Sequence, residues 1–353
     1  MGDSVTGPGV RILLRDVALR ANVSGATASR ALADDPRISA ATRQLVKTAA
    51  AELRYVPNVA ARSLRVRHTR TLGLLLPDVR DPVHGQIASG FEQEARKEGY
   101  CVMVVAGERD LARERTGLRS FTEHGTDGVA VVSGLISPRE LGERVHAGRL
   151  VHVWPDHRSM PRDGRPPLPG VVQTDDASGV RAAVNHLIDG GSRRIAYAAD
   201  GVRASNTIRA ETTAATLRER GIGTSMRTFV AGNGPGRADE LAAALAASLP
   251  DAIVCYDDKL ALELMDALRR LGVSVPDDVE IVGFDGIPFA AISNPRLTTV
   301  AVPSEEIGRQ SAAILIQSIR EGTMPEGVVL PVEFVVRQST RFAPASLASP
   351  AAR

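Results

Sequence analysis

The run from Ser24 to Arg30 combines hydroxyl groups with a guanidinium. On a helix, Ala28 and Ala31 would face inward, and the outer face would display Gly25, Ala26, Thr27, Ser29 and Arg30. Hydroxyls exchange single hydrogen bonds, whereas a guanidinium donates two parallel bonds to a pair of acceptors. This outer face therefore predicts recognition of a polar, acceptor-rich partner.

Two short helices joined by a tight turn are predicted to hold this face. An apolar stripe at helical spacing from Leu14 to Ala21 predicts the first helix, which ends near Asn22. Asparagine tolerates the left-handed backbone of such a turn, and Ser24 can cap the second helix by accepting a backbone N–H bond. Such a helix-turn-helix presents a second helix slim enough to enter the DNA major groove.

A third helix is predicted to close this small core. Ser39 is placed to cap it, and the pattern continues to about Leu53. The residues expected to face inward are Leu45, Val46, Ala49, Ala50 and Leu53.

The following stretch, YVPNVAARSLR, predicts a short helix that depends on partners. Pro57 ends the preceding helix, Asn58 caps the new one, and Ala61 and Leu64 supply a small residue and an apolar wedge. Because so short a helix is unstable alone in water, it needs a partner and DNA to fold upon.

The distribution of charge supports a polyanionic partner. Residues 1–70 carry 12 basic and 5 acidic residues, a net charge of +7, so the remainder of this +2 chain carries −5. A basic segment joined to a mildly acidic body is typical of nucleic-acid binding. A solvated basic face is the alternative that charge alone leaves open.

Composition argues against several other classes of protein. With 353 residues, the chain is long enough for two or three globular units, and it has no apolar run of membrane-spanning length. Its first residues lack a secretory h-region, which predicts a cytoplasmic protein and disfavours a periplasmic solute-binding protein. Cys101 and Cys255 are far apart without nearby histidines, so buried free thiols are expected, with no disulfide or metal site.

Enzyme motifs are missing from the sequence. The glycine cluster GNGPGR, from Gly232 to Arg237, lacks the context and spacing of a dinucleotide motif and is expected to be a loop. No nucleophile elbow or phosphate-cradling motif is found. We therefore expect a binding protein without a cofactor.

The ordered series of motifs resembles the LacI-type transcription repressor family. The run LRDVALRANVSGATASRALADDPRISAATRQLVKTAAAELRYVPNVAARSLR resembles its headpiece and hinge. TRTLGLLLPDVRDP, NHLIDGGSRRIAY, VPDDVEIVGFDG, PRLTTVAVP and LPVEFVVRQST resemble its core, so the resemblance extends from about Leu13 to Thr340. It implies a homodimer on a near-palindromic operator, with Leu64 of each subunit in the minor groove and with affinity controlled by a small-molecule effector.

The core sequence agrees with such a binding domain. Eight short apolar runs, TLGLLLP, CVMVVA, GVAVVS, LVHVW, GVVQT, RIAYAA, AIVCY and EIVGF, alternate with helical stretches and predict parallel α/β sheets. The runs alone leave open whether there is one sheet or two. The resemblance implies two subdomains like those of periplasmic binding proteins, with the chain crossing between them near Thr174, Val300 and Leu330.

The expected fold is an all-α helix-turn-helix headpiece with a hinge helix, joined to this two-subdomain α/β core. The expected divisions are a disordered start (1–10), headpiece (11–56), hinge helix (57–68), core (69–342) and disordered tail (343–353). Within the core, subdomain one spans about 69–173 plus 301–330, and subdomain two about 174–300 plus 331–342.

Ligands of open α/β sheets bind beyond the carboxyl ends of the strands. Arg209 and Asp285 match the family's ligand-binding positions, and we expect them to face each other across the cleft. Asp257 stands where the family usually has asparagine. The candidate effector-binding residues are Asp81, His84, Trp154, Arg209, Asp257 and Asp285.

This set suits a sugar or sugar derivative, because two carboxylate oxygens can accept bonds from vicinal hydroxyls. A purine-like corepressor is the alternative, since Trp154 could stack on a base and Asp257 could accept from its amine. Packing by Trp154 and a surface salt bridge of Arg209 are the plainer interpretations. On the DNA side, Gly25 and Ala26 occupy the two positions that most often specify bases in the family. Neither offers a side-chain hydrogen bond, so readout there must rest on thymine methyl contact, on closer backbone approach, or on Arg30 and the hinge.

Overall fold

The computed structural model describes residues 12–55, 68–145, 149–154, 168–200, 204–222, 226–232, 234 and 236–341. It divides the chain into two compact units, Met1–Thr69 and Arg70–Arg353. Asn58, Ala61 and Leu64 of the predicted hinge helix lie outside the described residues, as do the predicted disordered ends.

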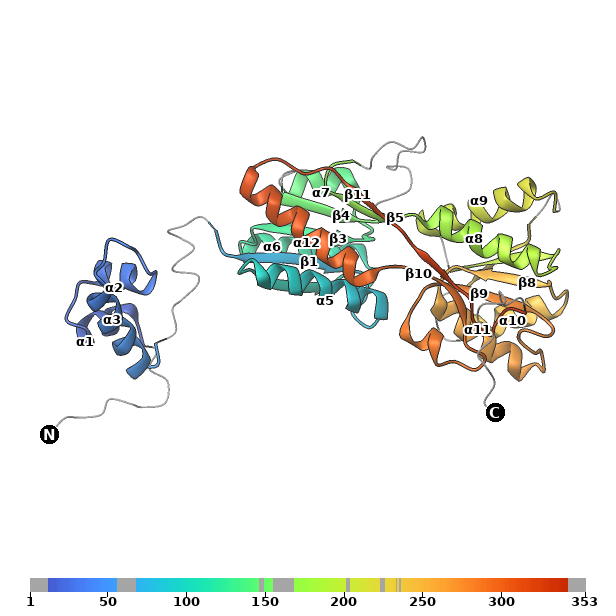
Figure 1. The fold of residues 1–353 in the computed structure, drawn as a ribbon, viewed down its shortest axis with the longest axis horizontal. Helices are drawn as coiled ribbons and strands as arrows, with labels where there is room; N and C mark the ends of the chain where they lie inside the picture. The colour runs from blue at the N-terminus through green and yellow to red at the C-terminus, as the bar shows by residue number, and fades with distance from the viewer. Residues whose placement is uncertain are drawn as a thin grey trace, which may run out of the picture. The chain divides into compact units, whose positions relative to one another are not determined.

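The first unit contains three helices, α1 (Leu14–Arg20), α2 (Gly25–Leu32) and α3 (Ala40–Glu52) (Figure 1). Val17, Ala28 and Val46, one from each helix, are completely buried and form the centre of its core. The prediction that Leu45 faces this core is wrong, because its side chain is 53% exposed. It precedes Val46 by one residue, and a helical step of about 100° turns it away from the core stripe.

The second unit contains two six-stranded sheets. Sheet one has the order β11-β5-β4-β3-β1-β2, and sheet two has the order β12-β10-β9-β8-β6-β7. The strands of sheet one are β1 (Thr71–Leu76), β2 (Cys101–Ala106), β3 (Gly128–Val132), β4 (Leu150–Val153), β5 (Val171–Thr174) and β11 (Val328–Leu330). Those of sheet two are β6 (Ile195–Asp200), β7 (Thr228–Ala231), β8 (Ala252–Cys255), β9 (Glu280–Asp285), β10 (Thr298–Ala301) and β12 (Glu333–Val335).

Helices cover both sheets because the strands are apolar on both faces. Around sheet one lie α5 (Pro82–Lys97), α6 (Leu111–Glu123), α7 (Pro138–Arg144) and α12 (Ser304–Glu321). Around sheet two lie α8 (Asp176–Asp189), α9 (Ala204–Glu219), α10 (Arg237–Ala246), α11 (Asp258–Arg270) and the short 3-10 helix η3 (Pro288–Ala291). Figure 1 shows α8 with α9, and α10 with α11, on opposite sides of sheet two.

The chain passes between the sheets three times. It leaves sheet one after β5, returns from β10 to α12, and leaves again from β11 to β12. All eight strands predicted from the sequence are present, and the sheets are parallel except where β12 pairs antiparallel with β10. The question of one sheet or two is thereby answered.

Two details differ from the sequence-based expectations. Cys101 is exposed because it begins β2, the edge strand of sheet one, whereas Cys255 in central strand β8 is buried as expected. The glycine cluster does lie between a strand and a helix, since it joins β7 to α10, although Gly236 leads into α10 from a loop as predicted.

In the described ranges, none of the helices has the length and apolarity needed to cross a membrane.

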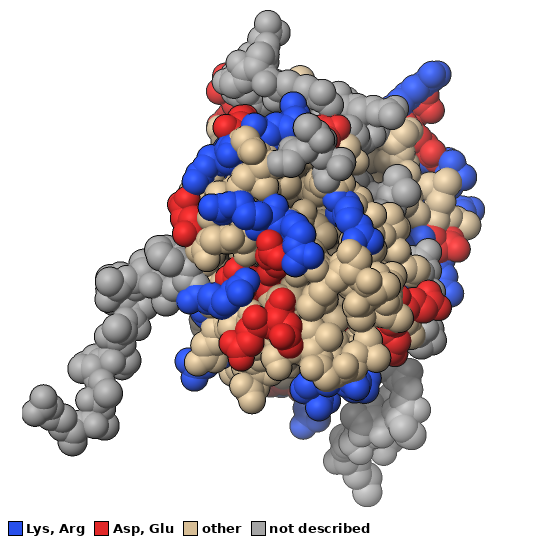
Figure 2. All heavy atoms as spheres, turned by 90° about the vertical axis from the view of Figure 1, so that its right-hand side faces the viewer, with Lys and Arg blue, Asp and Glu red and all other residues tan. Residues whose placement is uncertain are grey.

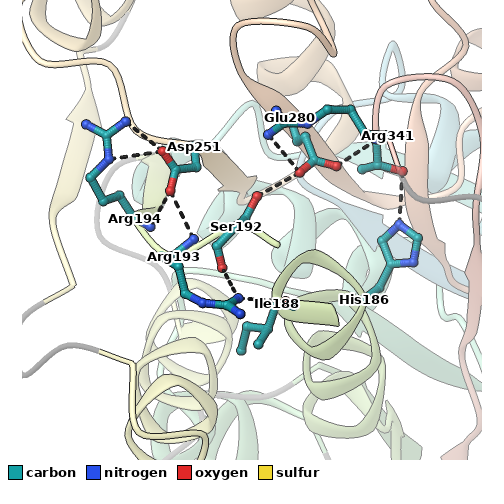
Figure 3. Close-up of polar contacts among 9 residues, drawn as sticks. His186, Ile188, Ser192, Arg193, Arg194, Asp251, Glu280 and Arg341 are labelled. Carbon is teal, nitrogen blue, oxygen red and sulfur yellow. Dashed lines mark hydrogen bonds and ion pairs between the residues drawn. The ribbon is translucent and has the colours of Figure 1, made fainter. Parts of the chain in front are cut away.

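A polar cluster fixes the chain after its last crossing (Figure 3). The fully buried carboxylate of Glu280 accepts bonds from the Ser192 hydroxyl and the Arg341 backbone N–H, both at 2.7 Å. His186 shares a 3.0 Å hydrogen bond with the Thr340 hydroxyl, and burial lowers the pKa of its imidazole. The segment after β12 is therefore anchored to sheet two.

Candidate functional site

The exposed face of α2 is built by its cap. Ser24 precedes the helix, and its hydroxyl oxygen accepts the Thr27 backbone N–H at 3.1 Å, as the sequence predicts. Its hydroxyl also shares a 2.9 Å bond with the Thr27 hydroxyl. Asn22 adopts the predicted left-handed conformation with φ of 51°, which turns the chain sharply from α1 into α2. The helix-turn-helix therefore follows from local sequence.

The accessibility of α2 suits contact with a groove. Gly25, Ala26 and Arg30 are exposed, whereas Thr27 and Ser29 are half-buried. A Cβ built on Gly25 meets no other atom within 4 Å, so internal packing does not require glycine there. The small residues leave the start of α2 open to close approach, and Arg30 supplies a long cationic donor one turn later.

In the core, Arg209 of α9 is held by several partners at once. Its Nε donates to Asp176 at 2.9 Å, and its terminal nitrogen Nη1 donates to the carbonyl of Tyr256 at 2.5 Å. The guanidinium also lies 3.5 Å from the ring centroid of Phe284. Its side chain is only 6% exposed, so a surface salt bridge is excluded as its role. Burial opposes the charge, but Asp176 and Asp285 outweigh that effect and raise the pKa of Arg209.

Asp285 lies beside Arg209 rather than across a gap. The second terminal nitrogen of Arg209, Nη2, is 3.7 Å from the Asp285 carboxylate, beyond hydrogen-bonding distance. Both residues belong to elements around sheet two, so the expected facing arrangement across the cleft is not what the structure shows. Burial raises the pKa of Asp285, Arg209 opposes this, and the charges of Asp257 and Asp258 add to it.

Asp257 and Asp258, at the start of helix α11, both accept hydrogen bonds through their carboxylates. Asp257 caps α11 by accepting the Leu260 N–H at 2.7 Å. Asp258 is completely buried and accepts from the Thr299 hydroxyl at 2.5 Å and from the Ile287 N–H at 2.8 Å. Burial raises the pKa of Asp258 to about 7, despite these bonds. Two carboxylates therefore flank the site from the end of β8.

The loop after β1 brings a third carboxylate near the cleft. Asp81 caps α5 by accepting the Val83 N–H at 3.0 Å, and its charge contributes to the raised pKa of Asp285. His84 is 7% exposed, and its Nδ1 is 2.8 Å from the Asp78 carbonyl oxygen. His84 therefore braces its own loop through one nitrogen.

Trp154, at the end of β4, has a defined polar partner. Its indole N–H donates to the Thr174 hydroxyl at 2.9 Å. Its ring is half-buried and packs against the cores of both sheets. Its φ of 49° lies in the left-handed region, which non-glycine residues rarely adopt. Packing is thus part of its role.

A cavity of about 450 Å³ opens between elements of the two sheets. Asp81 from the sheet-one side and Asp257 from the sheet-two side both line it, together with Lys259 and Gly234. The other four candidate effector residues are not among its lining residues. Among the described residues, no group of three or more histidine, cysteine or acidic side chains is arranged to hold a metal.

Four contributors near Arg209 were missed from the sequence, namely Thr174, Asp176, Tyr256 and Phe284. All of them lie at or just beyond the carboxyl end of a strand, the location that singled out Asp257 and Asp285. The same rule applied to β5 would have found Thr174 and Asp176.

Comparison with known proteins gives matches along most of the chain. Residues 13–58 match the model of bacterial regulatory proteins of the lacI family, and residues 184–340 match a periplasmic binding protein-like domain. The HTH-type transcriptional repressor CytR of Escherichia coli (strain K12) is 30% identical, over 94% of this chain and 97% of its own length. The ribose operon repressor of Bacillus subtilis (strain 168) is 31% identical, over 93% and 98%.

Solved structures agree with the fold. A lac repressor dimer bound to operator and the anti-inducer ONPF superposes with a TM-score of 0.83 at 22% identity, covering 94% of this chain and 99% of that one. A regulator from Enterococcus faecium with bound ribose gives a TM-score of 0.66 at 26% identity, covering 76% and 98%. The headpiece and the two-sheet core thus occur together in solved proteins.

Proposed function

Because the chain belongs to the LacI family of bacterial regulatory proteins, we propose that it is a DNA-binding repressor controlled by a small molecule bound between its two sheets. The observation that carries the proposal is the combination, in one chain, of an open polar face on α2 with the pair formed by buried Arg209 and half-buried Asp285. The first supplies a reading surface, and the second supplies polar groups of the kind that fix a ligand.

We assign operator binding to the first unit. A homodimer would place α2 of each subunit in successive major grooves of a near-palindromic site, with the two hinge helices at the centre. The charge on one face of the core agrees with this division, since Figure 2 shows acidic and basic side chains intermingled there. That face offers no broad basic field for a polyanion.

The two core lobes of this proposal follow the boundaries expected from the sequence, about 69–173 plus 301–330 and about 174–300 plus 331–342. Membership of β11 in sheet one and of β12 in sheet two supports this division. An effector between the lobes would change their angle and thereby the separation of the hinges. Release from the operator would make it an inducer, and tighter binding a corepressor.

The effector we propose is a sugar or sugar derivative. The 3.7 Å separation of Arg209 and Asp285 is too long for a direct hydrogen bond, yet a ligand hydroxyl can accept from one and donate to the other. The relative named as a ribose operon repressor and the ribose-bound structure support this class. Phosphate esters should bind less well than neutral sugars, because Asp176 and Asp285 already neutralise Arg209.

A purine-like ligand is the second candidate. The observation that favours it is Asp257, whose carboxylate lines the cavity and suits an exocyclic amine as donor. Nucleosides therefore belong in the same screen.

The test is a thermal-shift screen of sugars, their phosphate esters and O-methyl ethers, and nucleosides. A ligand at 100 times its Kd adds about 2.7 kcal/mol of stability. Asp285→Ala should abolish this shift and the ligand's effect on operator binding, while ligand-free DNA binding persists. Asp277→Ala, at an exposed aspartate, is the matched control. If a ligand stabilises Asp285→Ala as much as the wild type, the proposed site is wrong.

A further inference from the structure

A continuous chain of polar contacts runs from Trp154 to Asp285. The Trp154 indole donates to the Thr174 hydroxyl at 2.9 Å, and that hydroxyl donates to Asp176 at 2.5 Å. The other oxygen of Asp176 accepts from Arg209 Nε at 2.9 Å, and Arg209 ends beside Asp285.

The direction of this chain is fixed by its chemistry. An indole nitrogen only donates and a carboxylate only accepts, so the Thr174 hydroxyl must accept from Trp154 and donate to Asp176. No other arrangement satisfies both neighbours. Valine has the shape of threonine without the hydroxyl, and it would break both bonds at once.

The chain also crosses from one sheet to the other. Trp154 follows β4 of sheet one, whereas Arg209 and Asp285 belong to elements of sheet two. Thr174 is the last residue of β5, where the main chain leaves sheet one, and Asp176 is the first residue of α8. A hydroxyl at the crossing therefore links a ring packed against both cores to the guanidinium of the proposed effector site.

The side chain of Arg209 is held in place on several sides. Its Nε and Nη1 are bonded to Asp176 and the Tyr256 carbonyl, and Phe284 covers one face. The Nη2 end, 3.7 Å from Asp285, is the part that the ligand of the proposed effector site would contact. A ligand that displaces this end of the guanidinium must also strain the hydrogen bond between Arg209 Nε and Asp176.

We propose that Thr174 is a positioning residue that transmits the state of Arg209 and Asp285 to Trp154 across the first crossing between the sheets. This role rests on the proposed effector site, because a ligand there is what would drive it. We call this chain of contacts, Trp154–Thr174–Asp176–Arg209, the relay. Because Trp154 is the only tryptophan of the chain, its fluorescence reports directly on the Trp154 end of the relay.

The experiment is a double-mutant cycle read by fluorescence of the full-length protein without ligand. Thr174→Val should raise acrylamide quenching of Trp154, because the indole loses its fixed partner. Thr174→Ser should restore the wild-type value. Arg209→Lys, which keeps the charge but loses the fork, should raise quenching in the wild-type background and cause no further rise in the Thr174→Val background.

Thr216→Val is the matched control, because Thr216 is buried but its hydroxyl bonds only within α9, to the Thr212 carbonyl. It should leave the quenching of Trp154 unaltered. The relay is refuted if Arg209→Lys raises quenching equally in the wild-type and Thr174→Val backgrounds, or if Thr174→Ser behaves like Thr174→Val. Since no ligand is used, such a failure is separate from a failed effector screen.

Discussion

Replacing Arg209 by methionine tests how the charges of the site are balanced. The change keeps an unbranched apolar side chain but removes the guanidinium that lies over the Phe284 ring, and it leaves Asp176 and Asp285 without their cation. Removing one partner of a buried ion pair costs about 3–5 kcal/mol, since an uncompensated charge stays buried. Arg209→Met should therefore lower the free energy of unfolding by this amount near neutral pH.

The loss should depend on pH in a defined direction. Burial already raises the pKa of Asp285 and Arg209 is what opposes it, so the variant should raise that pKa further. When the pKa of a carboxyl is higher in the folded than in the unfolded protein, its burial does not destabilise the fold in acid. The free energy of unfolding then falls as pH rises through the folded pKa. The deficit of Arg209→Met relative to the wild type should thus grow as pH rises above the ordinary pKa range of an aspartate.

Urea unfolding of both proteins at several pH values measures this deficit. Arg220→Met is the control, because Arg220 pairs with Asp189 at the surface and its loss should be small at every pH. A deficit of the same size at all pH values would refute the argument. It would show that Arg209 stabilises the core through its packing on Phe284 and not through charge.

Four further substitutions probe the DNA contacts and the core. Arg30→Ala should cost about 1–3 kcal/mol of operator binding and relax one base pair per half-site, whereas a uniform loss over all sequences would make it a phosphate contact. Leu64→Ser should remove most specific binding but keep the salt-sensitive non-specific mode, and unchanged operator affinity in a gel shift would contradict the hinge assignment. Gly90→Ala should destabilise by about 1–3 kcal/mol, because its Cβ would lie 2.0 Å from the Glu305 carbonyl oxygen. Gly85→Ala on the same helix meets nothing within 4 Å and should stabilise slightly, so equal urea midpoints would contradict the packing argument.

The strands found from sequence share a physical signature. Central strands such as β3 and β8 are buried along their whole length, so their residues are apolar without interruption. The strands that were not among the predicted runs are β7, β10, β11 and β12, which have three or four residues each. β7 and β12 also expose part of their surface, which leaves an apolar signal too brief to stand out.

The site was predictable only in part, because the residues that pair within it are far apart in the sequence. Arg209 and Asp285 were found from the family motifs, but their partners depend on packing. Asp176 is 33 positions from Arg209, and the Tyr256 carbonyl it also bonds is 47 positions away. Cleft residues at strand ends can be proposed from a pattern, whereas the pairing among them is set by how α8 and α9 pack on sheet two.

The placement of Asp176 makes the cleft sensitive to the crossings between the sheets. Gly179, one turn later on α8, packs so closely that a Cβ would lie 2.5 Å from Val300 and 2.6 Å from Val332. Val300 is in β10, just before the second crossing, and Val332 lies in the third, between β11 and β12. Because packed interiors transmit displacement instead of absorbing it, the start of α8 cannot move independently of these segments. A change in the angle between the sheets must therefore shift Asp176, and with it the only fixed Nε partner of Arg209 among the described residues.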